Sequence, residues 1–313
     1  MYCINHTSIR PYLCSVSVFF LFILTSMQGL AKSEYTEIHY PNSQSQYDIR
    51  VKYPLELLAL ALSKSSSPYK LIKSDEATTQ SRALKLLHDE GGLDVVWTMT
   101  NLEREKDFLP VRIPILKGLI GWRVLIIKEQ NQPLFDNINN LKQLKKLVAG
   151  QGLDWPDTDI LKSNGLAVET STNYDRLFEM LQKGRFEYFP RSITEVWLEL
   201  SQRPEQQLAA EKKLLLYYPT AMYYFVKKDN NKLANDIQQG LEEAIEDGSF
   251  DTLFYTYNQV LIDKSKLSER TIITLTNPQL SKDTPLDNTA LWFSLPREQI
   301  PDTPLNQGLG YLH

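Results

Sequence analysis

The residues best suited to bind a ligand follow a short apolar run, Leu93–Trp97, in the first third of the chain. Thr98 and Thr100 supply two hydroxyl groups, and Arg104 supplies a guanidinium whose planar set of donors matches a carboxylate. An apolar run of this length is typical of a strand buried on both faces of a parallel sheet. Ligands bind at the carboxyl edge of such sheets. These side chains therefore predict an anion site, with Trp97 as its aromatic neighbour.

Two later segments carry the other candidate ligand-binding residues. Gln151 and Gly152 form an expected turn before a helix, where backbone N–H groups and the helix dipole favour an anion. Trp155 follows them as a candidate aromatic lid. Tyr188 and Arg191 lie at the end of another expected strand, where Tyr188 would flank the ligand and Arg191 would bias its charge.

The arginine at position 191 leaves two interpretations open. If Arg191 points into the same cleft as Arg104, the two guanidinium groups repel unless an anion lies between them. The ligand would then have two acidic ends or no free amine. If Arg191 instead pairs with Glu187 or Glu195, nothing about the ligand follows. Arg104 likewise has a plainer interpretation, as an exposed arginine at a helix start that pairs with a neighbouring glutamate.

Composition limits the functions that remain. The chain of 313 residues is 42% hydrophobic and 23% charged, which indicates a globular protein. A net charge of −4 argues against a nucleic-acid surface. The histidines and cysteines form no metal or nucleophile motif, so we expect no catalytic residue, no metal site and no cofactor.

The N-terminus has the pattern of a secretory signal peptide. Arg10 precedes a mostly apolar run, Tyr12–Leu24, and the small-residue site Gly29-Leu30-Ala31 follows it. The sequence therefore predicts cleavage after Ala31 and a periplasmic location, with an uncleaved anchor as the alternative. Both cysteines, Cys3 and Cys14, lie within this segment, so the mature chain would have no disulfide and no catalytic thiol.

The remaining apolar pattern predicts two α/β units joined by two crossing strands. Short apolar runs alternate with amphipathic helices, which calls for parallel sheets. The expected order is an α/β unit over Glu37–Trp97, a crossing strand over Ile120–Lys128, a second α/β unit over Leu141–Ser201 and a second crossing strand over Leu214–Val226. Two helices follow, and from Lys264 a polar, proline-containing segment reads as an irregular tail anchored by Leu291, Trp292 and Phe293.

This organisation resembles the periplasmic solute-binding proteins of the amino-acid type. In that family an apolar strand runs into Ser/Thr-x-Thr-x-x-Arg, and the arginine binds the α-carboxylate of the ligand. The counterparts are Thr98, Thr100 and Arg104, with Arg104 four residues after Thr100 instead of three. Gln151-Gly152 resembles the glycine-containing turn that shares this carboxylate. Arg191 stands near the position of the aspartate that holds the ligand's amino group in the family.

The resemblance implies an α/β, two-lobed periplasmic-binding-protein-like (type II) fold with two crossing strands. The implied organisation is a signal peptide over 1–31, lobe 1 over 32–125 and 218–263, lobe 2 over 126–217, and a tail over 264–313 that packs on lobe 1. The two lobes would close on a ligand between them like a hinge.

The function that the resemblance implies is the capture of a small anionic or amino-acid-like ligand, one that bears a carboxylate, for an ABC-type importer. One alternative is a sensory or accessory module on the same fold that signals to a membrane partner. Another is a dehydratase or lyase for a small acid. The expected partners are the ligand and an inner-membrane permease or a membrane sensor protein, with no nucleic acid, and the protein is expected to be a monomer.

Overall fold

The structure, a computed structural model, describes residues 1–2, 35–43, 51–89 and 92–295. Its helices and strands all belong to the unit that starts at Tyr35. Residues 3–31 of the predicted signal peptide and residues 296–313 of the predicted tail lie outside the described residues. Among the residues that are described, no helix is both long and apolar enough to cross a bilayer.

Two groups of strands define two lobes. Lobe 1 contains the parallel pair β1–β2 and the antiparallel sheet β3-β11-β4. Backbone bonds connect the two sheets, since the Asp94 N–H donates to the His39 carbonyl at 2.9 Å. The elements of lobe 1 are β1 (Thr36–Asn42), α1 (Lys52–Ser63), β2 (Tyr69–Ala77), α2 (Gln80–His88), β3 (Val95–Met99), α3 (Leu102–Asp107), β4 (Leu109–Val111), β11 (Met222–Val226), α9 (Asn231–Glu246) and α10 (Ser249–Ser265).

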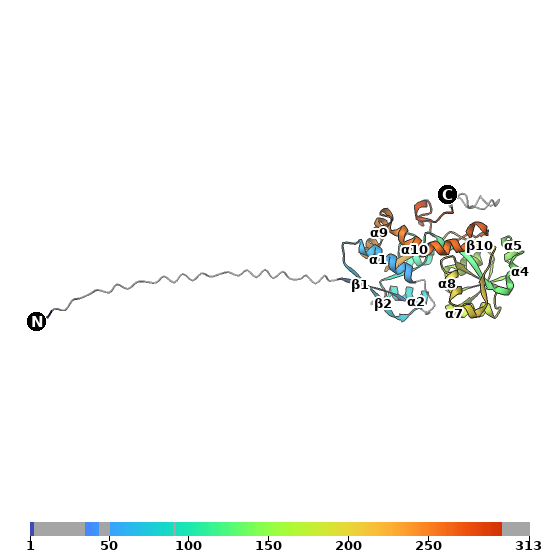
Figure 1. Ribbon diagram of the computed structural model, residues 1–313, viewed down its shortest axis with the longest axis horizontal. Helices are drawn as coiled ribbons and strands as arrows, with labels where there is room; N and C mark the ends of the chain where they lie inside the picture. Colours follow the sequence, from blue (N-terminus) through green and yellow to red (C-terminus); the bar gives the residue numbers. More distant parts are fainter. Residues whose placement is uncertain (3–34, 44–50, 90–91, 296–313) are drawn as a thin grey trace. The chain divides into compact units, whose positions relative to one another are not determined.

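Lobe 2 is built on one seven-stranded sheet, in the order β12-β10-β5-β8-β6-β7, with β9 also paired to β5. In Figure 1 its helices α4, α5, α7 and α8 lie to the right, whereas α1, α2 and α9 of lobe 1 lie to the left. The elements of lobe 2 are β5 (Trp122–Lys128), α4 (Gln132–Phe135), α5 (Leu141–Leu144), β6 (Val148–Gly152), α6 (Pro156–Ser163), β7 (Ala167–Ser171), α7 (Tyr174–Gln182), β8 (Tyr188–Ser192), α8 (Val196–Ser201), β9 (Leu208–Ala210), β10 (Leu214–Tyr217) and β12 (Thr271–Thr274).

The second expected α/β unit is confirmed, since β6 pairs in parallel with β7 and β8. In the first unit only β1 and β2 pair in parallel, and the expectation of one parallel sheet is wrong for β3, which pairs antiparallel with β11. The cores of the lobes are the predicted apolar runs: Leu125, Ile126 and Ile127 on β5 are all fully buried. The boundaries shift by a few residues. The strand expected over Leu93–Trp97 is β3, which starts at Val95, because the backbone of Asp94 bonds to β1 instead.

The chain crosses between the sheets twice, and the two crossings lie side by side. The Tyr218 N–H donates to the Gly121 carbonyl at 3.2 Å. A Cβ on Gly121 would lie 2.1 Å from the Tyr218 carbonyl oxygen, so only glycine permits this approach. The second crossing is two strands in different sheets, β10 and β11, where one strand was expected. Pro219 stands between them, and proline cannot donate to a strand ladder.

The segment after Lys264 contains a strand that the sequence did not predict. Thr271–Thr274 pairs in parallel with β10 and forms the edge of the large sheet. Of the predicted anchor residues, Phe293 packs its ring 5.9 Å from that of Trp122, and Trp292 covers Gly118. The lobe boundaries given by the sequence remain a prediction.

Candidate ligand-binding cleft

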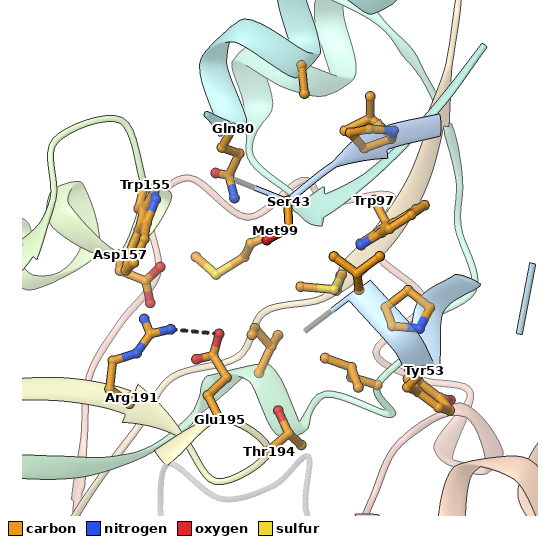
Figure 2. A pocket seen from close by; sticks show the side chains of 18 of the residues that line it. Ser43, Tyr53, Gln80, Trp97, Met99, Trp155, Asp157, Arg191, Thr194 and Glu195 are labelled. Atoms are coloured by element: carbon orange, nitrogen blue, oxygen red, sulfur yellow. Dashed lines mark ion pairs between the residues drawn. The ribbon is translucent and has the colours of Figure 1, made fainter. Parts of the chain in front are cut away.

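A cavity of about 190 Å³ is lined by residues from both lobes. A cavity of about 150 Å³ can hold benzene, so this one is large enough for a small organic molecule. Figure 2 shows lobe 1 residues above and to the right and lobe 2 residues to the left and below. The lining includes Ser43, Tyr53, Gln80, Trp97 and Met99 from lobe 1, and Arg123, Trp155, Asp157, Arg191, Thr194, Glu195 and Leu198 from lobe 2.

The lobe 1 wall is aromatic and uncharged where it is described. Trp97 packs against Tyr40 and Tyr224, with ring centroids 6.1 and 6.4 Å away. The Tyr53 hydroxyl donates to the Ile115 carbonyl at 2.6 Å, which directs the ring rather than the hydroxyl toward the cavity. This wall therefore offers apolar surface and ring faces to a ligand.

The lobe 2 wall is a buried network of ion pairs. Arg123 on β5 contacts Asp157 at 2.5 Å and Glu195 at 3.3 Å. Arg191 on β8 contacts Glu195 at 2.8 Å and Glu199 at 2.7 Å. Every one of these side chains is at most 7% exposed. The pairs therefore lie in a low-dielectric environment, where an unpaired charge would be costly.

The spacing of the glutamates explains how one arginine is held by two of them. Glu195 is four residues after Arg191, just past the end of β8, and Glu199 is four residues further, on α8. The guanidinium also lies 4.8 Å from the ring centroid of Trp155. Burial alone would lower the pKa of Arg191, but the carboxylates of Glu195 and Glu199 outweigh burial, and the pKa is raised.

Arg104 lies beside the cavity and binds acceptors of the protein itself. Its Nη1 donates to the Thr98 hydroxyl at 2.8 Å and to the Met99 carbonyl at 2.6 Å. Its Nη2 donates to Gln80 Oε1 at 2.7 Å and, across the cleft, to the Asp154 carbonyl at 3.0 Å. None of these four acceptors is charged. Burial therefore lowers the pKa of Arg104 to about 10, although the Asp154 carboxylate opposes the shift.

No protein-family model and no curated protein sequence matches this chain. Solved structures do. An ancestral arginine-binding protein bound to arginine has a TM-score of 0.54 at 18% identity, and the match covers 71% of this chain and 97% of that one. A periplasmic binding protein of high arginine specificity from Salmonella typhimurium has a TM-score of 0.54 at 15% identity, over 71% and 98%. A histidine kinase sensor domain has a TM-score of 0.53 at 12% identity, over 72% and 96%.

This chain has the two-lobed fold of the periplasmic solute-binding proteins. The matches cover nearly all of those proteins, so the correspondence extends over both lobes. At such low identity the agreement concerns the fold alone. The resemblance inferred from the sequence is confirmed at that level.

Within the solute-binding-protein fold, three of the nine predicted site residues line the cavity: Trp97, Trp155 and Arg191. Arg191 lines the cavity and also pairs with Glu195, the partner named in the second interpretation, and with Glu199. Trp155 packs over Gly152, where a Cβ would lie 2.4 Å from the indole.

The other predicted residues lie outside the lining. Thr98 accepts from Arg104, as described above, and the Thr100 hydroxyl donates to Glu105 at 2.6 Å. Gln151 is fully buried, and its side-chain oxygen accepts from the Gly152 N–H at 3.3 Å. Tyr188 is fully buried in the core beside Phe135. A ligand-binding role for these residues stays a prediction.

Sequence reasoning missed most of the charged wall. The buried ion pair of Arg123 could have been predicted, because an arginine within the apolar strand Trp122–Lys128 is rarely buried unless it pairs with a carboxylate. Glu195 and Glu199 also follow Arg191 at helical spacing. Asp157 carried no such signal. Among the described residues, no group of three or more acidic, histidine or cysteine side chains is arranged to hold a metal ion.

Proposed function

We propose that this chain is an exported solute-binding protein that encloses one small ligand between its lobes. The observation that carries the proposal is the cavity of about 190 Å³, whose walls come from both lobes and combine aromatic faces with charged groups. Sites for small molecules are concave, mostly apolar and equipped with a few placed polar groups. The N-terminal signal pattern supports export to the periplasm.

The matched structures support binding as the role. Two are arginine-binding proteins and one is a histidine kinase sensor domain. A binding protein could deliver its ligand to an ABC-type permease in the inner membrane. The match to a sensor domain favours a second candidate, a module whose ligand-bound state is read by a membrane signalling protein. Both roles require the same event, closure of the lobes on a ligand.

The test is a ligand screen on the mature chain, residues 32–313. A ligand whose free concentration is 100 times its Kd stabilises the folded state by about 2.7 kcal/mol. A true ligand therefore gives a clear rise in Tm. Native mass spectrometry of protein purified from its own periplasm identifies a co-purified molecule directly.

Two tryptophan variants show whether the cavity is the site. Trp97→Ala removes a lining ring and should abolish the rise in Tm, whereas Trp197→Ala lies outside the lining and should preserve it. A protein that is purified empty, and whose Tm responds to no amino acid, amine, organic acid or sugar, contradicts the proposed function.

A further inference from the structure

We propose that the lobe 2 wall recognises a cationic group, so that the ligand is a small amine without a free carboxylate. This inference rests on the proposed function and specifies its ligand. It starts from the charges of the ion-pair network. Arg123 and Arg191 supply two positive charges, whereas Asp157, Glu195 and Glu199 supply three negative charges. The network therefore has a net charge of −1.

The neighbouring arginines do not supply the missing positive charge. Arg203 is paired with Asp175 at 2.6 Å. Arg104 donates to uncharged oxygens, and the carboxylates of Asp154 and Asp157 both oppose the lowering of its pKa. Counting Arg203 with Asp175, and Arg104 with Asp154, leaves the excess of one negative charge unchanged. A buried charge without a counter-ion is costly, and a cationic ligand would supply that counter-ion.

Asp157 is the group best placed to meet such a ligand. Its Oδ1 takes both the ion pair with Arg123 and the hydrogen bond from the Tyr218 hydroxyl. Neither of these two contacts uses Oδ2. Figure 2 shows the carboxylate of Asp157 turned toward the cavity, between Trp155 and Arg191. One oxygen of a buried carboxylate is thereby left to accept from a ligand.

The opposite wall suits a cation as well. Trp97 lies across the cavity from Asp157, with Gln80 above and Met99 near the centre of the view (Figure 2). An ammonium or guanidinium group over an indole face is attracted by the ring quadrupole. A cation held between Asp157 and Trp97 would therefore be stabilised from both lobes, and such a contact favours closure.

The charge balance also ranks the ligand classes. A monovalent cation brings the network with its ligand to neutrality. A zwitterionic amino acid leaves one negative charge, and a dicarboxylate raises the total to three. Arg104, where a carboxylate was predicted to bind, already donates to Gln80 and to the Asp154 carbonyl, which a carboxylate would have to displace. An amine should therefore bind more tightly than its own amino acid.

The experiment compares matched pairs, in which the amine carries a single positive charge, by calorimetry on the mature protein: tyramine with tyrosine, and choline with betaine. We expect at least one amine to bind, and to bind at least tenfold more tightly than its carboxylated counterpart. In Asp157→Asn the affinity for that amine should fall at least tenfold, with Asp159→Asn, an exposed acid on the same helix, as the control.

The ranking within each pair is measured on the unmodified protein, so it does not depend on whether Asp157→Asn folds. An amino acid that equals or exceeds its amine overturns the inference and leaves the proposed function standing. The same holds if only organic acids or neutral solutes bind. If no solute of any class binds, the proposed function itself fails.

Discussion

Two buried arginines, one beside the cavity in lobe 1 and one in its wall in lobe 2, are stabilised in opposite ways. Arg191 is held by two carboxylates of its own lobe, Glu195 and Glu199. Arg104 is held by four uncharged oxygens, and one of them, the Asp154 carbonyl, belongs to the other lobe. The pKa values follow these environments: that of Arg191 is raised, and that of Arg104 is lowered to about 10.

The two arginines therefore have different roles: the contacts of Arg191 lie within one lobe, whereas one contact of Arg104 joins the two lobes. Removing a carboxylate from Arg191 leaves a buried cation poorly compensated, which typically costs 3–5 kcal/mol, so this network should stay intact whether the lobes are open or closed. The bond from Arg104 to Asp154 is a single hydrogen bond between a cation and a carbonyl, worth about 1.5–3 kcal/mol. It must break whenever the lobes separate. Arg104 therefore acts as a joint between lobes, and Arg191 as part of one rigid wall.

The largest effect is expected for Glu199→Gln. This change keeps the shape of the side chain but removes one of the two charges that hold Arg191, and it weakens the acceptor for the Tyr174 hydroxyl. We expect a loss of about 3–5 kcal/mol in the free energy of unfolding, measured by urea denaturation. Glu179→Gln, in an exposed pair with Lys183, is the control and should change stability by less than about 0.5 kcal/mol. A loss below about 1 kcal/mol for Glu199→Gln would remove the distinction between the two arginines.

The next effect is expected for Arg104→Met, which keeps the length of the side chain and removes all of its donors. Unfolding free energy should fall by about 1–3 kcal/mol, because Thr98 and Gln80 lose their donor. The lobes should also open, which small-angle scattering detects as a larger radius of gyration. Arg82→Met, at an exposed pair with Glu76, should change neither quantity. An unchanged radius of gyration in Arg104→Met would show that this arginine does not hold the lobes together.

The sequence predicted the order of the elements well, because that order depends on local patterns. Apolar runs of strand length, helix-spaced leucines and breaks at glycine and proline are all visible within a few residues. The position of Arg104 near the cleft was predicted for the same reason, since it follows the end of β3. Its partners were not, because the reach of a long side chain is decided by the other lobe, 50 residues away at Asp154.

The charged wall could not be assembled from the sequence for a related reason. Arg123, Asp157 and Glu195 come from β5, α6 and the start of α8, and only the fold brings them together. Asp154 stands two residues before Pro156 and three residues before Asp157, a sequence pattern typical of a helix N-cap. In the structure its carboxylate instead accepts from Ser81 of lobe 1, and Trp155 takes the cap position. A local rule was thus overridden by a contact between lobes.

A smaller effect is expected for Asp154→Ala. The backbone carbonyl that accepts from Arg104 remains, but the carboxylate that accepts from the Ser81 N–H at 3.1 Å is lost. We expect about 1 kcal/mol of destabilisation, since this contact is exposed to solvent. The radius of gyration should increase less than in Arg104→Met. Asp159→Ala on the same helix is the control. If Asp154→Ala opened the lobes as far as Arg104→Met does, the carboxylate rather than the carbonyl would be the main joint.

The smallest effect, about 0.5 kcal/mol or less, is expected for Ser81→Ala, which removes the hydroxyl donor to Asp154 and keeps the backbone N–H bond. Ser81→Ala is most informative when it is combined with Arg104→Met, because both residues contact Asp154 from lobe 1.

If opening of the lobes breaks both contacts at once, the double variant should lose less unfolding free energy than the sum of the losses in the two single variants. Residues in one network typically show coupling of at least about 0.5 kcal/mol, whereas independent sites add. Strict additivity in urea denaturation would mean that the two contacts open separately, and the joint would then consist of Arg104 alone.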